Sequence, residues 1–205
     1  MRLVISQHKG FVNSALLLWY NFSMKYAILL RGVNVGGNHK VPNTEFRQVL
    51  ESLGFTDVVT YINSGNAVGA HENVPSRHEI QKVLEDHFGF TIPTLVIPGA
   101  QIQAIAAAIP LEWTNDAPKP DKSGNKSDVL YLFEELDTPD APARLNYNPA
   151  NEQMMYVKGA VIATVTRKNQ TRYSLLKVIG TGLYGYMTVR NVNTARKLAE
   201  LVSKP

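Results

Sequence analysis

The chain of 205 residues contains no cysteine, and its N-terminal apolar run is short. The missing cysteine excludes disulfides, thiolate chemistry and cysteine-ligated zinc or iron–sulfur sites. It is typical of a reducing compartment, and we expect the protein to reside in the cytoplasm. The apolar run at residues 15–20 falls far short of the ~20 residues that a membrane span needs, so we expect no membrane attachment.

The motifs of several common catalysts are also missing. The glycine-rich stretch after the first predicted strand has Asn38 and His39 where a P-loop needs Lys followed by Ser or Thr. The G-x-S-x-G motif does not occur. The histidines complete no zinc-binding spacing, and no base is visible that would activate Ser64 as a nucleophile. We therefore predict no metal and no cofactor, and whether the protein is an enzyme stays open.

Half of the excess positive charge lies in the first 23 residues. Residues 1–23 hold Arg2 and Lys9 and no acidic residue, and taking these two from 21 basic side chains leaves 19 against 17 acidic ones. We interpret residues 1–23 as a non-native upstream translation artefact or a loosely attached, disordered extension, and Met24 as the native start. The remaining balance indicates a solvated mixed surface and disfavours nucleic-acid binding.

Strand and helix signals alternate from residue 24 to about residue 110. Short runs of strand-forming residues predict strands at 25–31, 58–62, 67–70 and 93–97. Apolar residues at helical spacing predict helices at 42–53 and 80–88, which Gly54 and Gly89 end. The order is strand, helix, strand, strand, helix, strand. A helix rich in Ala and Ile follows at 100–109.

The same order returns after a polar connector at 114–127. We predict strands at 129–133, 154–157, 161–166 and 186–189, a short helix or turn at 138–147, and helices at 173–179 and 191–202. The fold class is therefore α+β, with two ferredoxin-like (βαββαβ) repeats packed into one compact chain. We place the first half at residues 24–110 and the second at residues 111–205.

Three motifs resemble the signatures of a bacterial family of uncharacterised proteins. They are Leu-Arg-Gly-Val-Asn-Val-Gly-Gly at 30–37, Thr-Tyr-Ile-Asn-Ser-Gly-Asn at 60–66 and Thr-Val-Arg-Asn-Val-Asn-Thr at 188–194. In this order they resemble the domain of unknown function 1697 family from Met24 to about Leu201. The resemblance implies a ferredoxin-like α+β protein without an agreed activity.

Topology brings two of these motifs together. A helix crosses between the first two strands, so these strands run parallel and end at one edge of the sheet. The loop at 31–40 should therefore face the turn at 63–66. Its glycines, cations and exposed amides favour an anion such as a phosphate or carboxylate. The candidate ligand-binding residues are Arg31, Asn34, Gly36, Gly37, Lys40, Asn63, Ser64, Gly65, Asn66, Arg190 and Asn191.

A structural role for the same residues is the alternative interpretation. The side chains would then tie the two turns together by hydrogen bonds, and Asn191 would cap the last helix. Among function classes we favour the binding of a small anionic or phosphorylated molecule. A protein–protein interaction module that uses sheet edges or the helix at 102–109 comes second. Weak nucleic-acid binding comes last, because the strand at 66–70 lacks the stacked aromatics of an RNA-recognition sheet. The sequence does not fix the oligomeric state.

Overall fold

The computed structural model describes residues 24–117 and 119–204, so the interpretation of residues 1–23 lies outside the described residues. The first half contains, in chain order, β1 (Met24–Leu30), α1 (Asn43–Ser52), β2 (Thr56–Thr60), β3 (Asn66–His71), α2 (Arg77–Phe88), β4 (Thr94–Pro98) and α3 (Gly99–Ala107). The second contains β5 (Asn125–Leu132), α4 (Ala141–Arg144), β6 (Glu152–Val157), β7 (Ala160–Thr166), the 3-10 helix η1 (Arg167–Arg172), α5 (Ser174–Val178), the 3-10 helix η2 (Gly182–Tyr186), β8 (Met187–Asn191) and α6 (Val192–Ser203).

Each half forms a four-stranded sheet, and the two sheets have the same strand order. These orders are β2-β3-β1-β4 and β6-β7-β5-β8. β1 pairs antiparallel with β3 and β4, and β3 pairs antiparallel with β2, so β1 and β2 run parallel as predicted. β5 has the same relation to β7 and β8. The predicted α+β fold of two ferredoxin-like repeats is confirmed.

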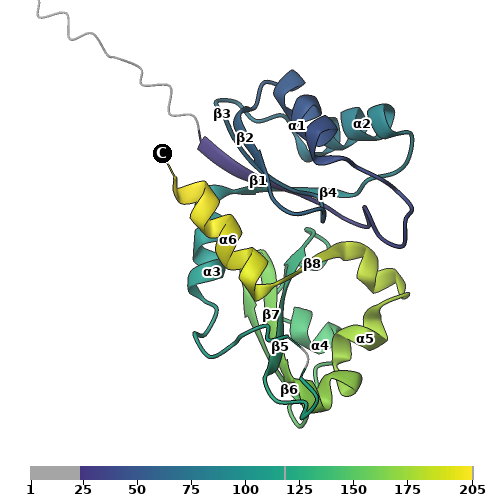
Figure 1. The fold of residues 1–205 in the computed structure, drawn as a ribbon, viewed down its shortest axis with the longest axis vertical. Helices are drawn as coiled ribbons and strands as arrows, with labels where there is room; N and C mark the ends of the chain where they lie inside the picture. Colours follow the sequence, from purple (N-terminus) through teal and green to yellow (C-terminus); the bar gives the residue numbers. More distant parts are fainter. Residues whose placement is uncertain (1–23, 118, 205) are drawn as a thin grey trace, which may run out of the picture.

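Successive side chains of the central strands point to opposite faces of each sheet. The apolar interior is therefore divided into three layers (Figure 1). In β1, Ala27 and Leu29 face the middle of the molecule, whereas Ile28 and Leu30 face the layer under α1 and α2. The middle layer holds α3 and α6, which pack side by side. Because both sheets contribute to this layer, the two halves share one central core.

The junction of β8 with α6 is fixed by a helix cap. The side-chain Oδ1 of Asn191 accepts a hydrogen bond from the backbone N of Thr194 at 2.9 Å. Such a cap stabilises a helix by about 1 kcal/mol. The apolar face of α6 is buried in the middle layer through Val192, Ala195, Leu198, Leu201 and Val202. This anchoring holds the end of β8, and with it Arg190, against the first half.

The second sheet begins earlier than the sequence predicted. β5 starts at Asn125 instead of residue 129, because its polar residues pair with β7 and two of them are buried. Ser127 Oγ lies 2.6 Å from Thr164 Oγ1, which satisfies both hydroxyls inside the protein. Neither η1 nor η2 was predicted.

Smaller differences occur at two elements of the first half. β2 spans 56–60 instead of 58–62, and Ile62 already lies in the turn with a φ of 47°. α2 begins three residues before the predicted start, because Ser76 and Glu79 form a capping box at its N-terminus. None of the helices within residues 24–117 and 119–204 has both the length and the apolar composition of a membrane span.

Candidate functional site

The loop after β1 is closed by Asn34. Its backbone N donates to His39 O at 3.0 Å, in a left-handed conformation with a φ of 57°. Its side chain bonds the backbone of Val41 twice, through Nδ2 to Val41 O at 3.1 Å and from Val41 N to Oδ1 at 2.9 Å. Both polar atoms of the Asn34 amide are therefore used in shaping the loop.

The turn between β2 and β3 packs directly on the end of β1. Leu30 N donates to Gly65 O at 2.8 Å. A Cβ at Gly65 would lie 2.6 Å from Leu30 Cβ and 2.7 Å from Val33 Cγ2, and its φ is +66°. Close packing and a positive φ thus both require glycine here. The structure brings the loop and the turn together, and Asn43 Nδ2 adds a bond to Asn63 Oδ1 at 3.1 Å.

Arg190 crosses from β8 into the first half and bonds its backbone. Its guanidinium donates to Asn66 Oδ1 (2.5 Å), Thr188 Oγ1 (2.8 Å) and the carbonyl oxygens of Leu30 (2.8 Å), Ser64 (2.8 Å), Val189 (2.9 Å) and Gly65 (3.3 Å). Within the described residues, none of these partners is a carboxylate. Burial lowers the pKa of Arg190 to about 10, so the side chain is still protonated at neutral pH.

A cleft of about 350 Å³ opens beside this guanidinium. It is lined by Leu30, Arg31, Gly32, Val33, Asn34, Val35, Asn63, Ser64, Tyr184, Thr188, Val189 and Arg190. This lining holds two arginines and no acidic residue. The guanidinium carbon of Arg31 lies 5.3 Å from the ring centroid of Tyr184, and Arg31 Nε is buried without a hydrogen-bond partner. The cleft is therefore a cationic site with an unused donor.

The remaining predicted residues lie around the cleft. Gly37 and Lys40 line a neighbouring hollow, also of about 350 Å³, which shares Asn34 and Asn63 with the cleft. Gly36 lines neither of these two hollows. Gly65 and Asn66 are buried beneath the cleft's turn, and Asn191 caps α6. The prediction of ligand contact stays a prediction for all eleven residues.

Sequence reasoning missed Tyr184, which stacks against Arg31 from the second half. It lies in η2, within the glycine-flanked stretch 180–186. No apolar periodicity marked this stretch, but its glycines at 180, 182 and 185 have the G-x-G-x-x-G spacing, which could have drawn attention to it. The run lies before β8 and does not link a strand to a following helix, so it lacks the context of a dinucleotide-binding loop. Because Tyr184 and Arg190 come from the second half and Arg31 from the first, the cleft exists only where the two halves meet.

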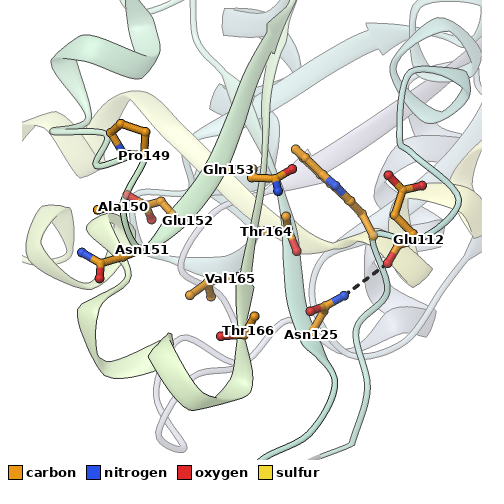
Figure 2. Close-up of a pocket in the computed structure, with 11 residues that line it drawn as sticks. Glu112, Asn125, Pro149, Ala150, Asn151, Glu152, Gln153, Thr164, Val165 and Thr166 are labelled. Atoms are coloured by element: carbon orange, nitrogen blue, oxygen red, sulfur yellow. Dashed lines mark hydrogen bonds between the residues drawn. The ribbon is translucent and has the colours of Figure 1, made fainter.

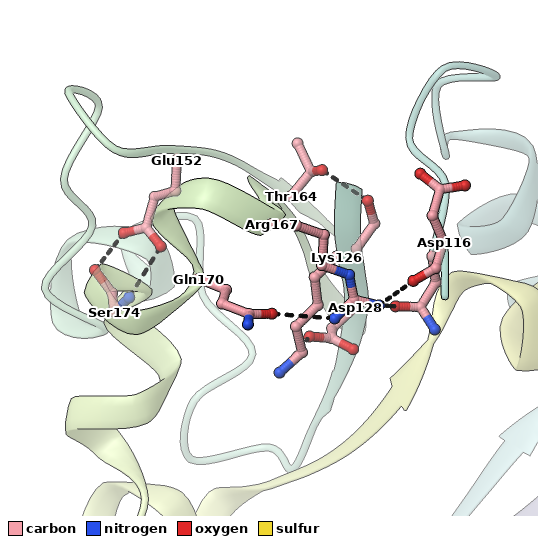
Figure 3. A network of polar contacts seen from close by, with 10 residues as sticks. Asp116, Lys126, Asp128, Glu152, Thr164, Arg167, Gln170 and Ser174 are labelled. Carbon is pink, nitrogen blue, oxygen red and sulfur yellow. Dashed lines mark hydrogen bonds and ion pairs between the residues drawn. The ribbon is translucent and has the colours of Figure 1, made fainter. Parts of the chain in front are cut away.

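A second polar cluster lies on the outer face of the second sheet (Figure 3). Asp128 Oδ2 is buried without a hydrogen-bond partner, and Lys126 Nζ lies 3.9 Å from it. Burial raises the pKa of Asp128, although the charges of Lys126 and Arg167 oppose this. Glu152 accepts a hydrogen bond from Ser174 N at 3.0 Å. These groups belong to one half and line no part of the cleft.

Comparison with known proteins finds one family and one solved structure that are similar to this chain. The sequence model of a family described as "Protein of unknown function (DUF1697)" matches residues 24–162. The chain is also similar to a solved structure described as conserved bacterial protein SP0830 from Streptococcus pneumoniae, with 26% sequence identity and a TM-score of 0.70. The similarity covers 89% of this chain and 99% of that one. No curated protein matches the chain.

Proposed function

We propose that this chain, which belongs to the DUF1697 family of proteins of unknown function, binds a small anionic or phosphorylated molecule in the cleft between Arg31 and Arg190. One observation carries the proposal: the buried Nε of Arg31 has no partner, in a cleft that holds two arginines and no carboxylate. A buried polar group without a partner costs free energy, and an anion would supply both the acceptor and the counter-charge.

The two arginines would contribute in different ways. Arg190 already donates to six oxygen atoms, so it would supply positive charge but few new hydrogen bonds. Arg31 retains an unused donor and is held from one side by the Tyr184 ring. A guanidinium fork matches the oxygens of a phosphate or carboxylate, and partial desolvation strengthens the pairing. Arg31 would therefore hold the ligand, and Arg190 would make the cleft electropositive.

The proposal includes the division of the chain into halves at residues 24–110 and 111–205, because the site needs both. Its main-chain groups come from the loop and the turn of the first half, and its aromatic wall comes from η2 of the second. We also keep cytoplasmic residence as part of the proposal, supported by the absence of cysteine from the chain.

Thermal denaturation in the presence of inorganic phosphate, pyrophosphate, nucleotides, sugar phosphates and small carboxylates tests the proposal. The variant Arg31→Ala removes the proposed contact, and Arg47→Ala, on the exposed face of α1, removes the same charge elsewhere. An anion present at ~100 times its Kd stabilises the folded state by about 2.7 kcal/mol. We expect at least one anion to raise the Tm of the wild type and of Arg47→Ala, and to leave that of Arg31→Ala unchanged.

Two outcomes would contradict the proposal. Either no anion of the panel raises the Tm of the wild type, or Arg31→Ala responds as strongly as Arg47→Ala. In the second case the stabilisation would come from general screening of a basic surface. Measuring the Tm again with added sodium chloride identifies this case, because screening by salt should raise the Tm of both variants equally.

A further inference from the structure

A second hollow, of about 330 Å³, lies where the connector after α3 meets the second sheet (Figure 2). Its walls come from Glu112 and Trp113 of the connector, the loop before β6, and residues of β5, β6 and β7. None of its lining residues belongs to the cationic cleft. Its size lies at the lower end of the ~300–1,000 Å³ that is typical of small-molecule sites.

Uncharged hydrogen-bonding side chains dominate the lining. Asn125, Asn151 and Gln153 each carry an amide that can donate and accept, and Thr166 adds an exposed hydroxyl. Figure 2 shows Gln153, Thr164 and Asn125 along one wall, on the neighbouring strands β6, β7 and β5. The Asn125 amide is held in place, because Nδ2 donates to Glu112 O at 3.2 Å.

The charges of the lining disfavour an anion. No lysine or arginine is among the lining residues, and Glu112 is an exposed carboxylate at the rim. The buried carboxylate of Glu152 is already occupied, because it accepts from Ser174 Oγ, from Ser174 N and from Asn148 N. A ligand that complements this surface would be neutral and rich in groups that both donate and accept.

Trp113 lines the hollow from a fixed position, but its indole packs mainly in the middle layer. The residue is only 6% exposed, its backbone N donates to Pro110 O at 3.0 Å, and its carbonyl accepts from Arg196 Nη2 at 3.2 Å. Little of the indole face is open to a ligand, so recognition would come from the amides around the hollow, which bind hydroxyls. A pyranose ring carries several hydroxyls around its rim.

We infer that the hollow beside Trp113 binds an uncharged polyhydroxyl ligand, such as the pyranose ring of a carbohydrate. The inference is independent of the proposed anion site, because the two share no lining residue and favour ligands of different charge, one neutral and one anionic.

Tryptophan fluorescence of the full chain tests the inference. The chain has two tryptophans, so Trp19→Phe leaves Trp113 as the only one. We expect glucose, galactose, N-acetylglucosamine or a related neutral sugar, titrated to millimolar concentrations, to change the Trp113 emission saturably. In the same background, Gln153→Leu should weaken the apparent affinity about fivefold through one lost hydrogen bond. Gln48→Leu, an exposed glutamine of α1, is the matched control and should leave the affinity unchanged.

The inference is overturned if no neutral sugar gives a saturable change, or if Gln153→Leu and Gln48→Leu bind sugar equally well. It is also overturned if only a cation such as spermidine changes the emission and Glu112→Gln abolishes that response, since the hollow would then be an acidic site. In the background of Arg31→Ala the sugar response should persist, which separates this test from that of the anion cleft.

Discussion

The two halves have the same topology, but they carry opposite charges at the equivalent edge. In the first half, the loop after β1 contains Arg31 and Lys40 and no acidic residue. In the second half, the corresponding loop after β5, at residues 133–140, contains four acidic residues and no basic one: Glu134, Glu135, Asp137 and Asp140. In both halves this loop lies beside the tight turn between the second and third strands of the sheet.

The two edges also differ in how their charges are balanced. Asp137 accepts from Gly159 N at 2.7 Å and from Tyr156 Oη at 2.9 Å, and it pairs with Lys158 Nζ at 2.6 Å. Asp137 is thus balanced by groups of its own half. The cationic edge is not balanced in this way, because Arg31 Nε has no partner and Arg190 bonds neutral oxygens. The topology supplies two similar edges, and only the unbalanced one is a candidate binding site.

The largest effect is expected from removing the guanidinium that joins the halves at the cationic edge. Arg190→Met should lower the free energy of unfolding by about 3–5 kcal/mol, because several buried oxygen atoms would lose their donors together. Urea denaturation followed by circular dichroism measures the change. Arg47→Met, on an exposed helix face, should change it by no more than about 0.5 kcal/mol.

A loss below about 1 kcal/mol in Arg190→Met would show that the carbonyl oxygens find water or other donors, and that the guanidinium is free to leave the interface. In that case Arg190 itself would become a candidate for direct ligand contact, and the division of labour between the two arginines would be wrong.

The glycines of the two equivalent turns should differ in their tolerance of alanine. At Gly65 a Cβ would meet the packed side chains of Leu30 and Val33, so Gly65→Ala should cost about 2–3 kcal/mol. At Gly159, with a φ of +86°, a Cβ would meet the end of the flexible Gln101 side chain, which can move away. Gly159→Ala should therefore cost about 1 kcal/mol, mainly from its positive φ.

Thermal denaturation of both glycine variants checks this difference. Equal losses at Gly65 and Gly159 would mean that backbone conformation alone sets the requirement for glycine. The tight packing of the turn at 63–66 against β1 would then not be what positions Ser64 at the cleft and Asn66 beneath it.

The sequence predicted the repeated fold because apolar runs and apolar periodicity report directly on burial, the first in β1 and the second in α6. It failed at β5, where Ser127 and Asp128 are polar yet buried by pairing with β7. The meeting of loop 31–40 with the turn at 63–66 followed from topology alone. The contribution of Tyr184 did not, because it depends on how two halves dock, and no local pattern records that contact.

The smallest effect concerns the balanced acidic edge and depends on pH. Burial raises the pKa of Asp137, but hydrogen bonds from Lys158, Gly159 and Tyr156 outweigh it and hold the pKa below its ordinary value. The ionised form therefore stabilises the fold at neutral pH, and this stability is lost as the pH falls through the lowered pKa. Asp137→Asn should cost about 1 kcal/mol at pH 7, and the difference from the wild type should shrink below pH ~4. Urea denaturation across this range measures it, with Asp57→Asn on β2 as the exposed control. If the difference in the free energy of unfolding between Asp137→Asn and the wild type stays constant down to the lowest accessible pH, the charge of Asp137 does not stabilise this edge. The contrast with the cationic edge would then lose its electrostatic basis.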